Sequence, residues 1–392
     1  MKFNIIAFLL LLSSNVIGSQ SIEFTPHISG IEPKIVTLQQ QNGSIQFEIR
    51  SGSGTLQSAQ SVNGPWTSVG GVTAGVAPNE ETKFLRLTRE REFNSFRRFP
   101  SRLYIPDNYD GEKPLPLIVR LHHLVIAFIP NLENLSEETE KYIPLRHLVD
   151  SEEFLYLTPR GLFGTGFDGR GFYWNASDQC CQNTERDNRL FLDDNAHIRS
   201  AIEWVIENYN VDTNRIMTFG TGAAGGTMAN EFACTNSDLV AGSISWGSLH
   251  WIDPVECSPR YPFHHLHIHS LTDDINDYQG GEIWQGISKI SGQRLAFTTK
   301  PVMTEFSNWA NRFGCGNLGE WELSVFKSNI GAPGPDTDII KYSGCDSNVI
   351  LEHWRVKTAN HLFDIGNGDK SELDNRIISW AKSHPKVSLT DQ

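Results

Sequence analysis

A glycine-rich turn stands where the chain could carry out chemistry. Residues 220–226 read Gly-Thr-Gly-Ala-Ala-Gly-Gly, between a predicted buried strand over 211–219 and a predicted helix over 227–234. A strand, a tight turn and a helix start together lift one side chain clear of a sheet and direct backbone N–H groups at an oxyanion. The side chain lifted here would be that of alanine or glycine, so the turn predicts the seat of a nucleophile without the nucleophile.

Six blocks over 99–385 resemble, in the same order, the secreted polyhydroxybutyrate-depolymerase and feruloyl-esterase type of α/β-hydrolase. Residues 113–122 resemble its PLPLVVxLHG strand, and residues 266–273 resemble its LHIHGTAD segment. The other four blocks are 154–161, 174–181, 192–198 and 354–361. The resemblance implies an α/β fold with a mostly parallel, doubly wound sheet, and the activity of a carboxylic ester hydrolase.

The resemblance also implies a catalytic site from which the serine is missing. Asp273 stands at the place of the family's acid and His361 at that of its base. Counting back from Met228 places the family's serine at Ala223, and counting forward from Gly220 places it at Gly222, because this chain has one extra residue in the turn. Thr221 is the candidate substitute for the missing hydroxyl.

The oxyanion loop departs from the family as well. The family's HGxGG-like run is replaced by His-His-Leu-Val-Ile-Ala at 122–127. Glycines in such a loop allow the backbone conformations that direct N–H groups at a substrate oxygen, whereas β-branched residues resist them. The residues expected to line the oxyanion and substrate site are His123, Leu124, Ala224 and Trp174.

Three alternating histidines raise the question of a metal site. His265, His267 and His269 would point to one face of a strand, and three imidazoles can hold zinc with one position open. The family has histidines at two of these places, and a central parallel strand is buried on both faces. We therefore favour a structural role, and expect neither a metal nor a cofactor.

The segment before the hydrolase blocks differs from them in composition and polarity pattern. Residues 1–19 resemble a secretory signal peptide, with an apolar run followed by small residues. Residues 20–90 alternate in polarity over 45–49 and carry turn signals at 51–54 and 63–65, which predicts a small all-β sandwich module. A charged linker is expected over 91–98, followed by the α/β-hydrolase domain over 99–387.

Composition fits an exported protein. The 392 residues are 39% hydrophobic, enough for a substantial core, and the net charge of −13 argues against nucleic acid and anionic membrane surfaces as partners. No segment after the signal peptide is apolar enough for membrane insertion. The six cysteines predict up to three disulfides: Cys180, Cys181, Cys234, Cys257, Cys315 and Cys345.

Three hypotheses of function follow. In the first, the chain is a secreted pseudoenzyme that binds an ester or polysaccharide-linked ligand without efficient hydrolysis. In the second, it is an active ester hydrolase that uses Asp273 and His361 with an unconventional nucleophile. In the third, the N-terminal β-module drives extracellular binding. The expected partner in each case is a small ester or a plant or polyester polymer.

Overall fold

The structure is a computed structural model of the whole chain. It describes residues 101–125, 143–162, 172–176, 193–248, 258–282, 298–329, 331–361 and 372–387, and outside these ranges only the backbone of individual strands. The chain divides into two compact units: residues 1–17 with 28–94, and residues 18–27 with 95–392. The candidate site lies in the second unit.

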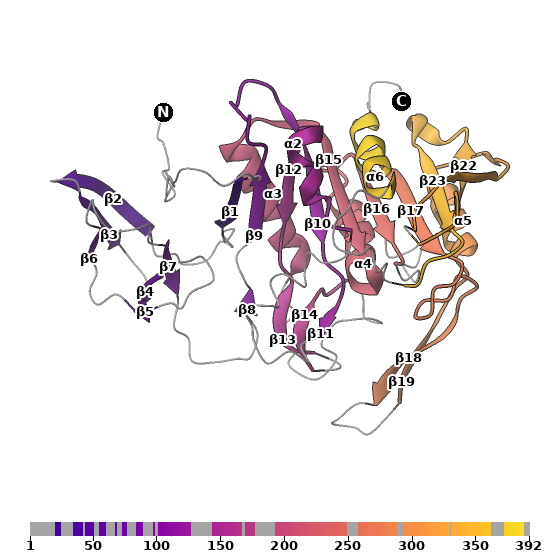
Figure 1. The fold of residues 1–392 in the computed structure, drawn as a ribbon, viewed down its shortest axis with the longest axis horizontal. Helices are drawn as coiled ribbons and strands as arrows, with labels where there is room; N and C mark the ends of the chain where they lie inside the picture. The colour runs from indigo at the N-terminus through magenta and orange to yellow at the C-terminus, as the bar shows by residue number, and fades with distance from the viewer. Residues whose placement is uncertain are drawn as a thin grey trace. The chain divides into compact units, whose positions relative to one another are not determined.

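One large sheet forms the centre of the second unit (Figure 1). Its five central pairs, from β12 to β23, are parallel, and the pairs at both edges are antiparallel. In spatial order the strands are β1 (Gln20–Phe24), β9 (Ser101–Ile105), β12 (Leu155–Thr158), β10 (Leu115–Leu121), β15 (Val211–Thr221), β16 (Gly242–Trp246), β17 (His264–Ser270), β23 (Leu351–Val356), β22 (Thr337–Ser343) and β20 (Asn317–Leu318), with β21 (Glu322–Phe326) also paired to β22.

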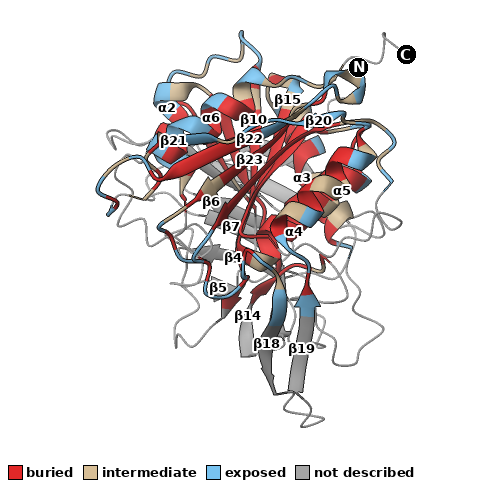
Figure 2. Cartoon of the chain, turned by 90° about the vertical axis from the view of Figure 1, so that its right-hand side faces the viewer, coloured by how far each residue is buried: buried red, intermediate tan, exposed pale blue. Residues whose placement is uncertain are grey.

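Helices cover both faces of this sheet, because the central strands are apolar on both faces. In β10, Leu117 and Val119 pack into one core cluster and Ile118 between them packs into the other, as strand alternation requires. The first cluster also takes residues from α3 (Asp194–Asn208), α4 (Gly222–Thr235) and α5 (Val302–Arg312). The second takes residues from α2 (Val149–Glu152) and α6 (Glu372–Ser383). Figure 2 shows these two groups of helices on opposite sides of the sheet.

The predicted fold class is confirmed. A mostly parallel, doubly wound sheet has the strand-to-helix turn after β15, Asp273 after β17 and His361 after β23, which is the chain order of an α/β-hydrolase. The block over 192–198 leads into α3, and its first N–H groups are capped, since the Asp193 carboxylate accepts a hydrogen bond of 2.9 Å from the Ala196 N–H.

β18 (Gly281–Ile287) and β19 (Arg294–Thr299) pair as an antiparallel two-stranded sheet. One local expectation was wrong in detail. Gln20–Phe24 was expected to open the N-terminal module, but it pairs with β9 at the edge of the large sheet. Strand pairing depends on partners far along the chain, which the local composition and polarity pattern do not indicate.

The first unit contains strands. Its strands form two three-stranded sheets, β2-β3-β6 and β5-β4-β7, with bounds Lys34–Gln41, Ser44–Arg50, Thr73–Val76, Thr67–Ser68, Thr55–Ala59 and Phe84–Thr88.

In the second unit, the end of the expected linker forms β8 (Arg97–Arg98), which pairs with β13 (Leu162–Gly166). β13 in turn pairs with β14 (Gly169–Tyr173), the partner of β11 (Val125–Ile126). The expected signal peptide lies outside the described residues.

One disulfide is described in full. Cys315, just after α5, is bonded to Cys345, just after β22. Cys234 on α4 is disulfide-bonded too. The other three cysteines, Cys180, Cys181 and Cys257, lie outside the described residues. Across the described part of the chain, no helix combines the length and apolarity needed to span a membrane.

Candidate active site

Asp273 and His361 meet at one edge of the sheet. They follow β17 and β23, which are neighbouring parallel strands, so the carboxyl ends of both strands lie side by side. Nδ1 of His361 lies 2.8 Å from one carboxylate oxygen of Asp273 and 3.0 Å from the other. Both residues are buried. This is the geometry in which an acid orients the imidazole of a general base.

The backbone of His361 is fixed on both sides. Its N–H donates to the carboxylate of Asp274 at 3.2 Å, and its carbonyl accepts a hydrogen bond of 2.8 Å from the indole of Trp246. Two residues earlier, the carbonyl of Ala359 accepts hydrogen bonds from the hydroxyls of Ser270 and Thr272. The histidine loop is therefore held in place by the strands β16 and β17 and by the acid loop, which reduces the reorganisation needed when a ligand binds.

The Asp273 carboxylate is kept ionised by hydrogen bonds. Burial raises the pKa of Asp273, but the hydrogen bonds and electrostatic interactions that it makes with His269 and His361 outweigh burial, so the net pKa lies well below its ordinary value. The backbone N–H groups of Ile275 and Asn276 add hydrogen bonds of 3.0 and 2.7 Å. An ionised Asp273 fixes the Nδ1–H form of His361, which leaves Nε2 as the nitrogen available to a reacting group. Within the described residues, that Nε2 has no hydrogen-bond partner.

The turn after β15 places a glycine at the strained position. Gly222 has a φ of +67° and is the first residue of α4, whereas Thr221 before it is extended. A left-handed residue between a strand and a helix is the mark of a nucleophile elbow. The sequence leaves two positions open for the missing serine, Gly222 and Ala223, and the left-handed conformation is at Gly222. Ala223, the position predicted for the missing serine, follows as a half-buried residue within α4.

The hydroxyl of Thr221 already has a partner. Its Oγ1 accepts a hydrogen bond of 2.7 Å from Nη2 of Arg120, and the residue is fully buried. Arg120 itself is buried, with its guanidinium 4.9 Å from the centre of the Phe219 ring. No hydrogen bond joins Thr221 to His361 within the described part of the chain. The structure therefore does not bring together the two groups that a threonine nucleophile would need.

The altered oxyanion loop is packed by its first histidine. Nε2 of His122 accepts a hydrogen bond of 2.9 Å from the N–H of Gly161, and its Nδ1–H donates to the His123 carbonyl at 2.7 Å. An accepting Nε2 needs a lone pair, so the ring is neutral, in agreement with a pKa that burial lowers to about 3. His122 thus acts as a structural link between β10 and the segment after β12.

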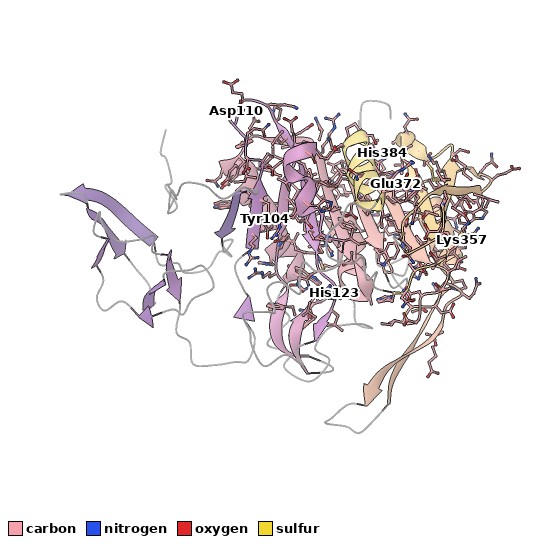
Figure 3. The ribbon with its side chains drawn as sticks, viewed as in Figure 1. Tyr104, Asp110, His123, Lys357, Glu372 and His384 are labelled. Atoms are coloured by element: carbon pink, nitrogen blue, oxygen red, sulfur yellow. A yellow bond between two sulfur atoms is a disulfide. The ribbon has the colours of Figure 1, made fainter. Side chains whose placement is uncertain are left out.

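The four residues expected to line the substrate site differ in exposure. Trp174 is fully buried, donates from its indole to the His122 carbonyl at 3.0 Å and stacks near the His122 ring, so it packs the loop from within. Ala224 on α4 and His123 are also buried, and Leu124 is half-buried. In Figure 3, His123 lies close to the strands β11 and β14. Leu124 is therefore the most open of the four to a ligand.

The three alternating histidines do share one face of β17, but they bind one another and their neighbours. Nδ1 of His265 pairs with the Ser243 hydroxyl at 2.8 Å, and Nδ1 of His267 pairs with the Ser245 hydroxyl at 3.0 Å. Nε2 of His267 contacts Nδ1 of His269 at 3.1 Å. The described residues contain no group of three or more histidine, cysteine or acidic side chains arranged to hold a metal ion.

Several residues of the site had no signal that singled them out. Trp246, Asp274 and Arg120 are single residues whose partners lie on other strands. His269 did have one, since it stands four residues before Asp273, and its Nε2 reaches the carboxylate at 3.3 Å. The sequence predicts a structural role or a metal-ligand role for His269, and its contact with the acid is a finding of the structure.

Comparisons with known proteins add likeness of fold only. No protein-family model and no curated protein sequence matches the chain. Among solved structures, an acetyl xylan esterase from Aspergillus awamori is similar with a TM-score of 0.45 and 13% identity, over 74% of this chain and 99% of that one. An S-formylglutathione hydrolase from Agrobacterium tumefaciens gives 0.39 and 10%, over 89% and 99%. These similarities are too low to assign an activity. The chain order of turn, acid and histidine in the sheet is what makes this unit an α/β-hydrolase fold.

Proposed function

We propose that the chain is a secreted protein of the α/β-hydrolase fold that binds an ester or a polysaccharide-linked ester and hydrolyses it inefficiently or not at all. The observation that carries this proposal is an intact, buried Asp273–His361 pair beside a turn whose left-handed residue, Gly222, has no side chain. Acid and base are in place, and the group that they would activate is missing.

The magnitude of this loss favours binding over turnover. In a serine hydrolase, removal of the nucleophile lowers kcat by about a million-fold, and only a residue of catalysis remains from binding and the oxyanion hole. The hydrogen bond from Arg120 to Thr221 argues against the candidate substitute. A site that keeps its hydrogen-bonding groups but lacks a nucleophile can still recognise the ester, because recognition uses the surrounding groups.

Export is part of the proposal. Disulfides persist in oxidising compartments, and the Cys315–Cys345 bond supports such a location. Together with the signal-peptide resemblance of residues 1–19, it favours an extracellular ligand such as a plant or polyester polymer. The affinity for the polymer is compared between the native full-length protein and the double variant Asp273→Ala, His361→Ala. Affinity that the double variant keeps would indicate a contribution from the N-terminal unit.

The test compares four proteins on a short-chain nitrophenyl ester: the native chain, Gly222→Ser, Ala223→Ser and His361→Ala. We expect the native chain to show no turnover above that of His361→Ala. We expect any restored, His361-dependent turnover in Gly222→Ser and not in Ala223→Ser, since the left-handed turn falls on residue 222. Efficient native turnover that His361→Ala abolishes would refute the binding proposal and favour an unconventional nucleophile.

Binding is measured on the same proteins. Addition of methyl ferulate to the isotope-labelled native chain should shift the amide resonances of residues 222–224 and 361. The matched control is His361→Ala, which should weaken or lose this response. An unchanged spectrum for the native chain, with both an aromatic and an aliphatic short ester, would count against a role in ester recognition.

A further inference from the structure

We infer that His269 is a positioning residue for the candidate active site: it holds the Asp273 carboxylate at the end of a one-directional hydrogen-bond chain that begins at Ser245 inside the sheet. This inference concerns the arrangement of protons behind the Asp273–His361 pair. It does not depend on which ligand the site takes.

The chain crosses two strands and ends on the acid. The Ser245 hydroxyl on β16 lies 3.0 Å from Nδ1 of His267 on β17. Nε2 of His267 lies 3.1 Å from Nδ1 of His269, and Nε2 of His269 lies 3.3 Å from the Asp273 carboxylate. All four residues are buried, so their hydrogen bonds are not exchanged with solvent.

The acceptors at the end of the chain fix the direction of every proton. Nε2 of His269 faces the Asn276 carbonyl at 2.8 Å as well as the Asp273 carboxylate, and both groups can only accept, so Nε2 carries the hydrogen. In the neutral form of that ring, Nδ1 of His269 has no hydrogen and accepts from Nε2–H of His267. Nδ1 of His267 then accepts from the Ser245 hydroxyl. Each donor therefore points toward the Asp273 end of the chain, where Nε2–H of His269 donates to the Asn276 carbonyl at 2.8 Å with the Asp273 carboxylate 3.3 Å away.

Two imidazoles converge on the same oxygen of Asp273. Nε2 of His269 is 3.3 Å and Nδ1 of His361 is 2.8 Å from Oδ2, while the backbone N–H groups of Ile275 and Asn276 hold Oδ1. Donors on both oxygens leave the carboxylate little freedom to rotate. These donors fix the plane of the Asp273 carboxylate so that Oδ2 faces His361. The His361 ring then keeps the orientation in which Nδ1 faces Asp273 and Nε2 faces away from it.

A second layer holds the middle of the chain. The ring of His353 stacks on that of His267, with centroids 5.3 Å apart. Nδ1–H of His353 donates to the His267 carbonyl at 2.9 Å, and its Nε2 accepts from the Tyr278 hydroxyl at 2.9 Å. His353 is fixed as a neutral ring, and burial lowers its pKa to about 3. The chain is thus packed as part of the core and reaches the site at Asp273.

The experiment measures tautomers at neutral pH. Long-range ¹H–¹⁵N correlations on the native protein distinguish the two neutral forms of each ring. We expect the Nε2–H form for His267 and His269 and the Nδ1–H form for His361. The Nδ1–H form at His269 would overturn the inference by itself, and this measurement needs no variant and no ligand.

Matched variants separate positioning from packing. His269→Gln keeps an N–H donor near the place of Nε2, whereas His269→Leu keeps the volume and loses the donor. The Nδ1 proton of His361 should move downfield in His269→Leu, because Asp273 then loses a competing donor and binds His361 more strongly, and it should stay near the native position in His269→Gln. Equal positions in the two folded variants would contradict the inference; if His269→Leu does not fold, the comparison is made between Ser245→Ala, which should scramble the His267 tautomer, and the native chain.

Discussion

At the scale of single residues, Asp273 and His361 form a buried pair, and the proposed loss of activity lies in the residue that they would act on. Gly222 takes the left-handed conformation of the elbow without a hydroxyl, and Thr221 directs its hydroxyl to Arg120. The Arg120 guanidinium is buried, so this hydrogen bond satisfies part of a charged group that has little access to water. Thr221, the candidate substitute nucleophile, therefore has a structural role.

Replacing Thr221 by Val tests this assignment. The variant should lower the free energy of unfolding by about 1–3 kcal/mol, because Nη2 of Arg120 loses a buried acceptor, and should leave ester hydrolysis unchanged. Chemical denaturation and a nitrophenyl ester assay measure the two effects. Thr221→Ser keeps the hydroxyl and serves as the control. A loss of turnover in the valine variant with restoration in the serine variant would instead make residue 221 a nucleophile.

At the scale of elements, the glycines of the turn bring α4 against the sheet. A Cβ at Gly225 would lie 2.4 Å from the carbonyl oxygens of both Leu121 and His122, and one at Gly220 would lie 1.9 Å from the carbonyl oxygen of Gly225. These are backbone atoms of a central strand and of the turn itself, so they cannot move aside at low cost. Much of the glycine content of residues 220–226 thus serves helix-to-strand packing.

Gly225→Ala should accordingly be destabilising. We expect a loss of about 1–3 kcal/mol or more in the free energy of unfolding, since overpacking of a rigid contact forces backbone shifts. The matched control is Gly334→Ala, where an added Cβ meets no atom within 4 Å, and where we expect a change of less than about 0.5 kcal/mol. Urea denaturation of both variants compares them directly. Similar stability of the two would mean that α4 lies further from β10 than described.

At the scale of the whole molecule, the buried histidines make stability depend on pH. Burial lowers the pKa of His122, His265 and His353 to about 3 in the folded chain, against about 6.5 in the unfolded chain. Between these two values the unfolded state binds protons that the folded state does not. Stability therefore falls as pH falls below about 6.5, and it continues to fall until the folded pKa is reached.

Acid should unfold the protein well above the pH at which its carboxylates are protonated. Each of these histidines contributes a loss of about 2 kcal/mol between pH 6.5 and pH 5, from about 1.4 kcal/mol per pH unit. Asp273 has a lowered pKa and loses its contribution only below about pH 4, outside this interval. Urea denaturation at pH 7 and pH 5 measures the slope. His353→Gln, which cannot take up the proton, should show a smaller slope, and an unchanged slope would contradict this origin.

The sequence by itself determined the class of fold and the order of its elements. Apolar runs over both faces of the central strands require helices on both sides of a sheet, and the α/β-hydrolase fold inferred from the six blocks is confirmed. The absence of serine from residues 220–226 is likewise a fact of the sequence alone. The fold class and the order of elements can be predicted because strand and helix patterns repeat over short distances along the chain.

Only the tertiary structure decided which atoms meet. One extra residue in the turn left Ala223 and Gly222 open as the position of the missing serine, and the left-handed φ falls on Gly222, the first residue of α4. Thr221 turns to Arg120, and His269 shares Asp273 with His361, because neighbouring strands fix which side chains face one another. Such contacts join residues up to about a hundred positions apart. Local sequence patterns indicate which face of an element a side chain is on, but the pairing of elements in space decides its partner.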